Sequence, residues 1–244
     1  MVAISAGDSR SYNDLLPIAA AQRAFKERGG EVAVDKLLSI IAEAGAESTV
    51  GVRLLHKHND LDPSEIMYET GTVDEKGFAL VTSAVSRGDV RSGPVCNSWC
   101  LTGSEFTAVE FSEAHIIAPE SDVTRHENLF HRLADAIVDL KVAAILGPCL
   151  NYSSYVEGFA PSPDAAFLEK TDFKNRANVV RYVLRSDAEF SNSAKTKWRA
   201  KRITDQIGRA TWMTACNCFC SVFPDGSGHQ GTTTHTYEPD RKDR

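Results

Sequence analysis

The feature that most limits the fold of this chain is a series of segments in which apolar and polar residues alternate. A period of two is typical of β-strands, because successive side chains of a strand point to opposite faces. The segments span 49–58, 65–70, 77–85, 95–101 and 105–111. The links between them are short and contain turn signals such as Asp-Pro and Thr-Gly-Ser, which favours antiparallel pairing of neighbouring strands.

Helices are expected on both sides of this series, where apolar residues recur at helical spacing or the chain is polar and basic. The predicted helices span 15–25, 34–42, 129–140 and 193–207. Further predicted strands span 178–184, 211–223 and 229–237. We therefore predict an α+β fold, a mostly antiparallel β-sheet or open barrel with N-terminal helices and at least one long amphipathic helix packed on it.

The chain has 244 residues, of which 42% are hydrophobic and 25% charged, values that are ordinary for a globular domain. We predict a single α+β domain over 1–244, with a candidate sub-boundary near 158–164 and a solvated tail at 238–244. Six cysteines without a secretory signal indicate free thiols in a reducing compartment, so a soluble, cytoplasmic protein is expected. The net charge of −6 argues against a membrane surface or nucleic acid as a general partner.

Two histidines stand out at the end of the first predicted strand. His56 and His58 continue the apolar face of 50–54, whereas Arg53 and Lys57 lie on the other face, which we expect to be wet. Imidazoles at i and i+2 are about 6–7 Å apart along a strand, so the pair can converge on one metal ion, or one ring can act as a general acid or base. The alternative is that the strand end emerges from the core with both rings half exposed.

The His56-Lys-His58 pair, followed by Glu65, partly resembles the first motif of the cupin family. Residues 224–229, Pro-Asp-Gly-Ser-Gly-His, have the Pro-x-Gly-x-x-His form of the second cupin motif. The resemblance covers these two short windows and implies metal ligands inside a β-barrel. In this hypothesis the two histidines and either Glu65 or His229 hold a divalent metal, Zn or Fe, that polarises a substrate or water.

The strand predicted at 211–223 carries three cysteines on one face, Cys216, Cys218 and Cys220. If this strand forms a hairpin with 229–237, Cys218 faces His235, and a thiol and an imidazole come together. Cys218 could then be a nucleophile with His235 as its base, or the thiols could hold Zn or Cu(I). The simpler interpretation is that the three reduced cysteines belong to an apolar core.

Positive charge is concentrated in 170–209, which has eleven basic and four acidic residues in a chain of net charge −6. The densest part is 195–202, Lys-Thr-Lys-Trp-Arg-Ala-Lys-Arg. This segment could bind a phosphorylated ligand or RNA, which would make the protein a non-catalytic binding module. A solvated helix face is the other interpretation.

Four further residues are predicted to bind a substrate. Tyr152 and Tyr155 lie in a loop that combines small, polar and aromatic residues, as pocket rims do. Arg176 and Arg199 supply positive charge for a polar group.

These patterns favour an enzyme that acts on a small polar metabolite in a β-lined pocket, with His56 and His58 as metal ligands or as general acid and base. Anion binding without catalysis through 195–202, and cysteine-dependent catalysis at 216–220, are the alternatives. No motif specifies the substrate, the reaction or the oligomeric state.

Overall fold

The computed structural model describes residues 4–5, 9–90, 94–118, 127–186, 193–204 and 210–221. The strands within these ranges are β1 (Ile4–Ser5), β2 (Val50–Leu54), β3 (Glu65–Asp74), β4 (Gly77–Ser86), β5 (Val95–Thr102), β6 (Glu105–Ser112), β7 (Leu146–Leu150), β8 (Ala165–Asp172), β9 (Ala177–Leu184), β10 (Ser193–Thr204) and β11 (Ala210–Ser221). The helices are α1 (Ser9–Asn13), α2 (Ile18–Glu27), α3 (Gly30–Glu43), α4 (Glu127–Asp139) and α5 (Ser154–Glu157), with a 3-10 turn η1 (Arg87–Asp89).

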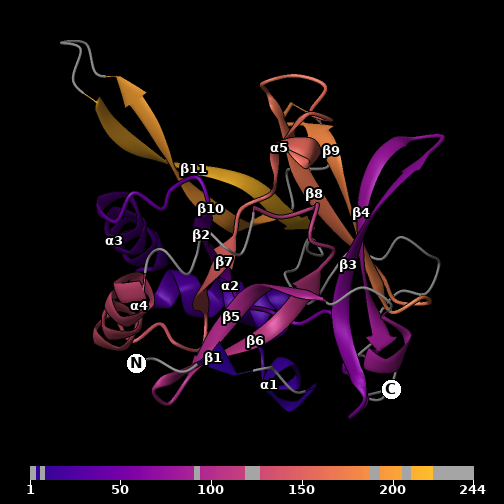
Figure 1. Cartoon of the computed structure of the whole chain (residues 1–244), viewed down its shortest axis with the longest axis horizontal. Coiled ribbons are helices and arrows are strands. Elements are labelled where there is room, and N and C mark those ends of the chain that lie inside the picture. The colour runs from indigo at the N-terminus through magenta and orange to yellow at the C-terminus, as the bar shows by residue number, and fades with distance from the viewer. Residues whose placement is uncertain are drawn as a thin grey trace, which may run out of the picture.

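The strands form one sheet that closes on itself as a ten-stranded β-barrel, with β1 as an extra strand (Figure 1). In order around the barrel they are β6, β3, β4, β9, β8, β11, β10, β2, β7 and β5. The ring closes at β6, which pairs in parallel with β3 and antiparallel with β5. Most neighbours are antiparallel, but β8 and β11 are parallel, and β1 runs parallel to the start of β6.

The predicted α+β class is wrong, because the structure is a closed, mostly β barrel with only a few short helices among the described residues. The alternation of residues locates most strands, but it does not say whether the first and last strands of a sheet meet. That closure depends on pairings between β2 and strands late in the chain, which no local pattern records.

The prediction of a helix over 193–207 is also wrong, since 193–204 is β10. Ala194, Thr196, Trp198 and Ala200 are buried, whereas Lys195 and Lys201 are exposed and Arg199 is partly exposed, so the segment has a period of two that only the buried Lys197 breaks. Lys and Arg are good helix formers, but a period of two matches a strand whatever the propensity of its polar residues. The strand β8 was not predicted at all.

The helices cover the outside of the barrel on one side. α2 and α3 contact β2, α3 also contacts β10, and α4 contacts β7. Leu37, Leu38 and Ile41 of α3 share one apolar core with Val50 and Leu54 of β2. The apolar face of β2 therefore points out of the barrel to the helices, and its other face points into the barrel. No helix within the described ranges is both long and apolar enough to cross a membrane.

Two glycines let the strands beside β2 approach closely. A Cβ atom on Gly147 would lie 2.0 Å from the backbone oxygen of Trp99, and one on Gly51 would lie 2.6 Å from that of Trp198. Both distances are far below van der Waals contact and involve backbone, which cannot rotate away as a side chain can.

We expect Gly147→Ala to lower the free energy of unfolding by at least about 2 kcal/mol, because the added methyl must push β7 away from β5. Gly88→Ala is the matched control, since a Cβ there meets only the Ser86 hydroxyl at 3.8 Å, and its effect should stay within about 0.5 kcal/mol. Urea unfolding followed by circular dichroism measures both. Equal stability of the two variants would contradict the close packing of β5 and β7.

Candidate functional site

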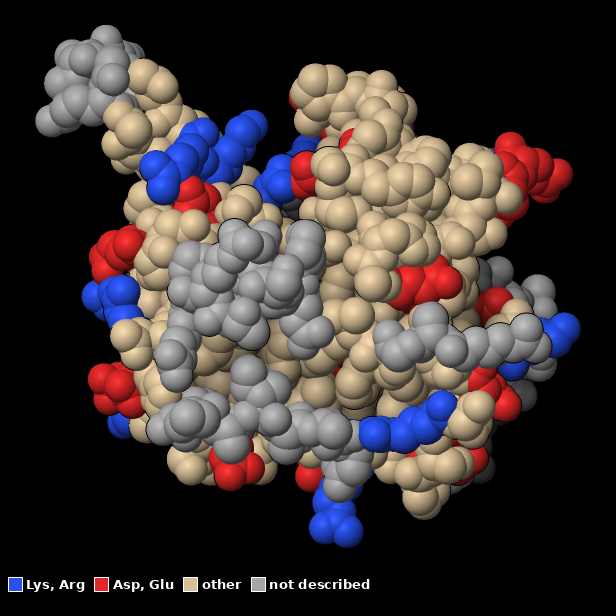
Figure 2. All heavy atoms as spheres, viewed as in Figure 1, with Lys and Arg blue, Asp and Glu red and all other residues tan. Residues whose placement is uncertain are grey.

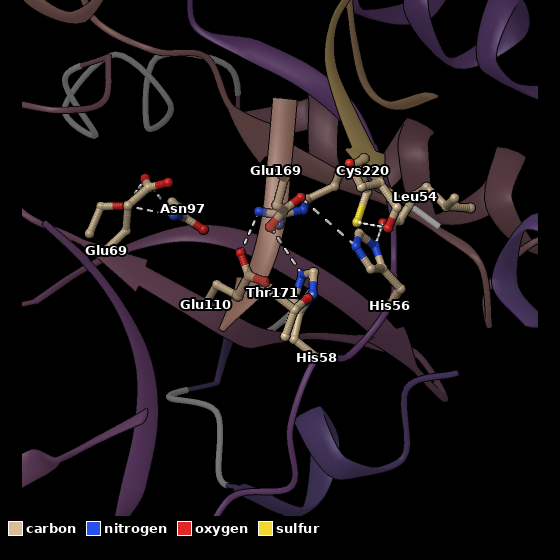
Figure 3. Close-up of polar contacts among 12 residues, drawn as sticks. Leu54, His56, His58, Glu69, Asn97, Glu110, Glu169, Thr171 and Cys220 are labelled. Carbon is tan, nitrogen blue, oxygen red and sulfur yellow. Dashed lines mark hydrogen bonds and ion pairs between the residues drawn. The ribbon is translucent and has the colours of Figure 1, made fainter. Parts of the chain in front are cut away.

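The inside of the barrel contains ionisable side chains that contact one another. We call Arg53, His56, His58, Glu110 and Glu169 the interior cluster (Figure 3). Their side chains are between 0% and 14% exposed. Arg53 comes from β2, Glu110 from β6 and Glu169 from β8, and the histidines follow the end of β2. Elements distant in the sequence therefore place these groups together.

Glu169 is the centre of the interior cluster. Its Oε1 atom is 3.0 Å from Nε2 of His58, and its Oε2 atom is 4.0 Å from Nε2 of His56. Arg53 donates a hydrogen bond to Glu110, and its second terminal nitrogen is 3.9 Å from Glu169. One carboxylate thus lies between a guanidinium and two imidazoles.

The other ring nitrogen of each histidine has its own contact. Nδ1 of His56 is 2.8 Å from the carbonyl oxygen of Leu54, which can only accept, so Nδ1 carries the proton and Nε2 has the free electron pair. Nδ1 of His58 is 3.3 Å from the Thr171 hydroxyl. These contacts fix both rings with Nε2 directed towards the barrel interior.

Burial and charge move the pKa values of these groups in opposite directions. Burial, together with the charge of His58, lowers the pKa of His56 to about 3, so this imidazole is neutral at pH 7. Burial opposes ionisation of Glu169, but His58, Arg53 and His56 hold its pKa well below the usual range. Burial raises the pKa of Glu110 despite the neighbouring Arg53.

A second polar group surrounds Glu69 of β3. The Tyr152 hydroxyl donates to Oε1 of Glu69 at 3.2 Å, and the Ser112 hydroxyl donates to Oε2 at 2.9 Å. The Asn97 amide donates to the same Oε2 atom at 3.4 Å. In Figure 3, Glu69 and Asn97 lie on the far side of Glu169 from the histidines.

Two cavities lie beside these groups. A small inner chamber of about 10 Å³ lies between the interior cluster and the Glu69 group. An end cavity of about 410 Å³ opens between α5 and the strands β8 to β11. In Figure 2 the molecule is hollowed between the lobe that carries α5 and the projecting β10–β11 hairpin. Tyr152, Lys197 and Cys218 line both cavities and therefore form the wall between them.

Lys197 points into the barrel beside Arg53, its partner in the β10–β2 ladder, at a point where β10 is irregular. The register with β11 shifts on both sides of Lys197, as at a β-bulge, and both Thr196 and Lys197 are buried. The ammonium nitrogen lies 3.8 Å from the centre of the Tyr152 ring. Among the described residues, no carboxylate forms an ion pair with it.

The structure places several predicted site residues near one another. His56 and His58 are 2% and 7% exposed, so they are not a half-exposed strand end. Strand β2 ends at Leu54, before both histidines. The prediction that Arg53 lies on a solvent-exposed face was wrong. Tyr152, Cys218 and Arg199 line the end cavity. Burial raises the pKa of the Cys218 thiol to about 12, so it is protonated at neutral pH.

Other predicted site residues lie elsewhere. Glu65 is not part of the group of ligand atoms around the histidines. It instead accepts two hydrogen bonds from Arg176, at 2.8 and 2.6 Å. Tyr155 is 51% exposed on α5. His229 and His235 lie outside the described residues, as does the strand predicted at 229–237. The other strand of that predicted hairpin is β11, in which Cys218 is paired with Lys197 of β10 and with Phe167 of β8.

The basic segment 195–202 has acidic partners. Lys195 pairs with Glu31 at 3.2 Å, Arg199 pairs with Glu157, and Arg202 pairs with Glu47. Blue and red side chains accordingly lie next to each other at the base of the β10–β11 hairpin (Figure 2). These pairs neutralise part of the charge on which the anion-binding alternative depends, and that alternative stays a prediction.

Sequence reasoning missed Glu69, Glu110 and Glu169. Each directly follows at least two apolar or aromatic residues within a strand, as in Phe-Thr-Ala-Val-Glu-Phe around Glu110. A carboxylate at a position where a strand should be buried is an informative signal. Lys197 was named only as part of a basic run.

No protein-family model matches the chain, and neither the curated proteins nor the solved structures include a significant match to it. The function must therefore be inferred from the residues of the barrel themselves.

The Glu65–Arg176 pair gives a pH-dependent prediction. Hydrogen bonds from Arg176 lower the pKa of Glu65 in the folded protein, so the pair stabilises the fold above the pKa of the unfolded chain and ceases to do so as pH falls through the folded pKa. We expect Glu65→Gln to reduce stability by about 1 kcal/mol at pH 7 and by less below about pH 4.

Thermal unfolding at several pH values measures this difference. Glu75→Gln is the control, because Glu75 is an exposed residue of the β3–β4 turn. If Glu65→Gln lowered the stability of the folded protein by the same amount at every pH, the carboxylate would act through its shape rather than its charge.

Proposed function

We propose that the protein is an enzyme that binds a small anionic metabolite in the end cavity and holds its charged group on Lys197. The carrying observation is the buried ammonium group of Lys197, which lies at the inner end of the cavity and contacts the face of Tyr152. No carboxylate of the described residues forms an ion pair with this ammonium group; a buried charge without such a partner is costly, and an anionic ligand would supply one.

The rest of the cavity supports this ligand class. A volume of about 410 Å³ is within the usual range for small-molecule sites. Basic residues outnumber acidic ones in its wall: Arg185, Lys197, Arg199 and Lys201 stand against Glu157. Aromatic residues complete the lining: Tyr152, Phe167 and Tyr182. Such a wall suits a carboxylate or phosphate on a flat or short organic body.

Tyr152 is the group that we assign as proton donor. Burial, with the charge of Glu69, raises the pKa of Tyr152 well above its usual value, so the phenol keeps its proton at neutral pH. Its hydroxyl donates to Glu69 beside the inner chamber, where a substrate oxygen bound on Lys197 could take that hydrogen bond instead. The wall between the two cavities thus combines the Lys197 ammonium group, which can bind an anion, with the neutral Tyr152 phenol, which can donate a proton.

Lys197→Met is expected to weaken anion binding about 10- to 100-fold, since it removes a charged contact. The same change should leave the ligand-free protein as stable as before or more stable, because it also removes a buried cation. A panel of small carboxylates and phosphate esters is screened by thermal shift at constant ionic strength, and affinities are measured by calorimetry.

Lys195→Met is the matched control, because Lys195 lies on the same strand, is half exposed and pairs with Glu31 outside the end cavity. It should change neither anion affinity nor stability by a measurable amount. If no anion of the panel binds the wild-type chain, or if both variants bind equally well, Lys197 does not hold an anionic ligand.

Tyr152→Phe tests the catalytic part of the proposal. Removing one hydroxyl should lower kcat by roughly 10²- to 10⁴-fold while KM changes little, because the cation and the aromatic ring remain. Each anion that binds is incubated with the protein, and conversion is followed by proton NMR. Anions that bind tightly without being converted by the wild-type chain would instead indicate a binding protein.

A further inference from the structure

We infer that His56, His58 and Cys220 form a metal site inside the barrel, suited to a zinc ion. One ligand atom from each of the three side chains lies within 4.8 Å of the other two. All three residues are buried. Two imidazoles and a thiol form a donor set that zinc prefers in proteins.

The three donors converge from different parts of the sheet. The histidines follow the end of β2, and Cys220 lies near the end of β11. The rings of His56 and His58 are 4.6 Å apart between centres and inclined at 68°. In Figure 3 the sulfur of Cys220 points towards the ring of His56, and the ring of His58 lies below Glu169. A hydrophobic core does not need two imidazoles and a thiol placed around one point.

The histidines are also oriented as metal ligands usually are. A ligating histidine commonly donates its second ring N–H to a carbonyl, which fixes the tautomer. His56 does this through Nδ1 and the carbonyl oxygen of Leu54, at 2.8 Å, so its Nε2 has the electron pair that a metal needs. Thr171 holds Nδ1 of His58 at 3.3 Å.

Glu169 lies beside the three donors, although it is not one of the residues whose ligand atoms lie within 4.8 Å of one another. Cys220 and Glu169 are directly paired in the parallel ladder of β11 and β8, so their side chains share one face of the sheet. The carboxylate oxygens lie 3.0 Å from Nε2 of His58 and 4.0 Å from Nε2 of His56. A carboxylate is an ordinary fourth zinc ligand, and its negative charge would offset that of the metal.

The distances require a small contraction. Ligand atoms around a tetrahedral zinc ion with bonds of about 2.0–2.3 Å lie about 3.3–3.6 Å apart. The present separations of up to 4.8 Å must therefore shorten by roughly 1 Å when the three atoms bind one ion. None of the three ligands lines the end cavity, so this site is separate from the proposed anion site.

The test measures metal in the full chain, expressed without a histidine tag in medium supplemented with zinc. Elemental analysis should find about one zinc ion per wild-type chain. Cobalt added to the metal-free chain should give the near-ultraviolet absorption of a cobalt–thiolate bond. Cys220→Ser should lose the zinc and this absorption. Cys149→Ser is the matched control, since Cys149 is equally buried and is not one of the ligands, and it should keep both.

The inference would be overturned if the wild-type chain held no zinc and showed no thiolate absorption with cobalt. It would also be overturned if the Cys220→Ser variant kept both the zinc and the absorption. If Cys220→Ser does not fold, alkylation of the wild-type chain in moderate urea replaces it. Zinc should then protect Cys220 and not Cys149, and equal labelling of Cys220 with and without zinc would also overturn the inference. Metal content does not depend on Lys197, so the failure of this site and the failure of the proposed function are distinguishable.

Discussion

The ion pairs of Arg53 inside the barrel are the interaction on which the arrangement of the site depends. The guanidinium connects β2 to Glu110 of β6 and lies 3.9 Å from Glu169 of β8, so it joins strands on different sides of the ring. Burial alone would lower the pKa of Arg53, but the two carboxylates hold it above its usual value, and the group stays charged. Because these charges have little water, each must lie close to a partner, and this requirement positions Glu169 against both histidines.

The burial of this charge is accompanied by a layer of helices on one side of the barrel. In most barrels the apolar faces of the strands fill the inside. Here β2 directs Val50, Val52 and Leu54 outward into the core shared with α3, and its inner face carries Arg53. The apolar core that stabilises this side of the protein thus lies between the barrel wall and the helices, which leaves the interior available for polar chemistry.

Much of the secondary structure followed from the sequence, and much of the site did not. Alternation located β3 to β6 closely, since hairpins are set by local turns and by a period of two. It also placed His56 and His58 in a dry environment, as found. The closure of the ring could not be predicted, because β2 meets β10 across most of the chain. For the same reason, nothing near Glu169 in the sequence indicated that it meets histidines more than a hundred residues earlier. Lys197 was missed because its segment was predicted to be a helix with a solvated basic face, whereas it is a strand in which Lys197 is paired with Arg53.

The strand order has a consequence for the way in which the chain folds. The early strands β3 to β6 can pair as local hairpins, but the wall next to β2 is complete only when β10 and β11, the last described strands, take their places. Contacts between distant segments form slowly, since a long loop must close before they contribute. We therefore expect the charged groups of the interior to keep their water until a late step of folding, when the ring closes.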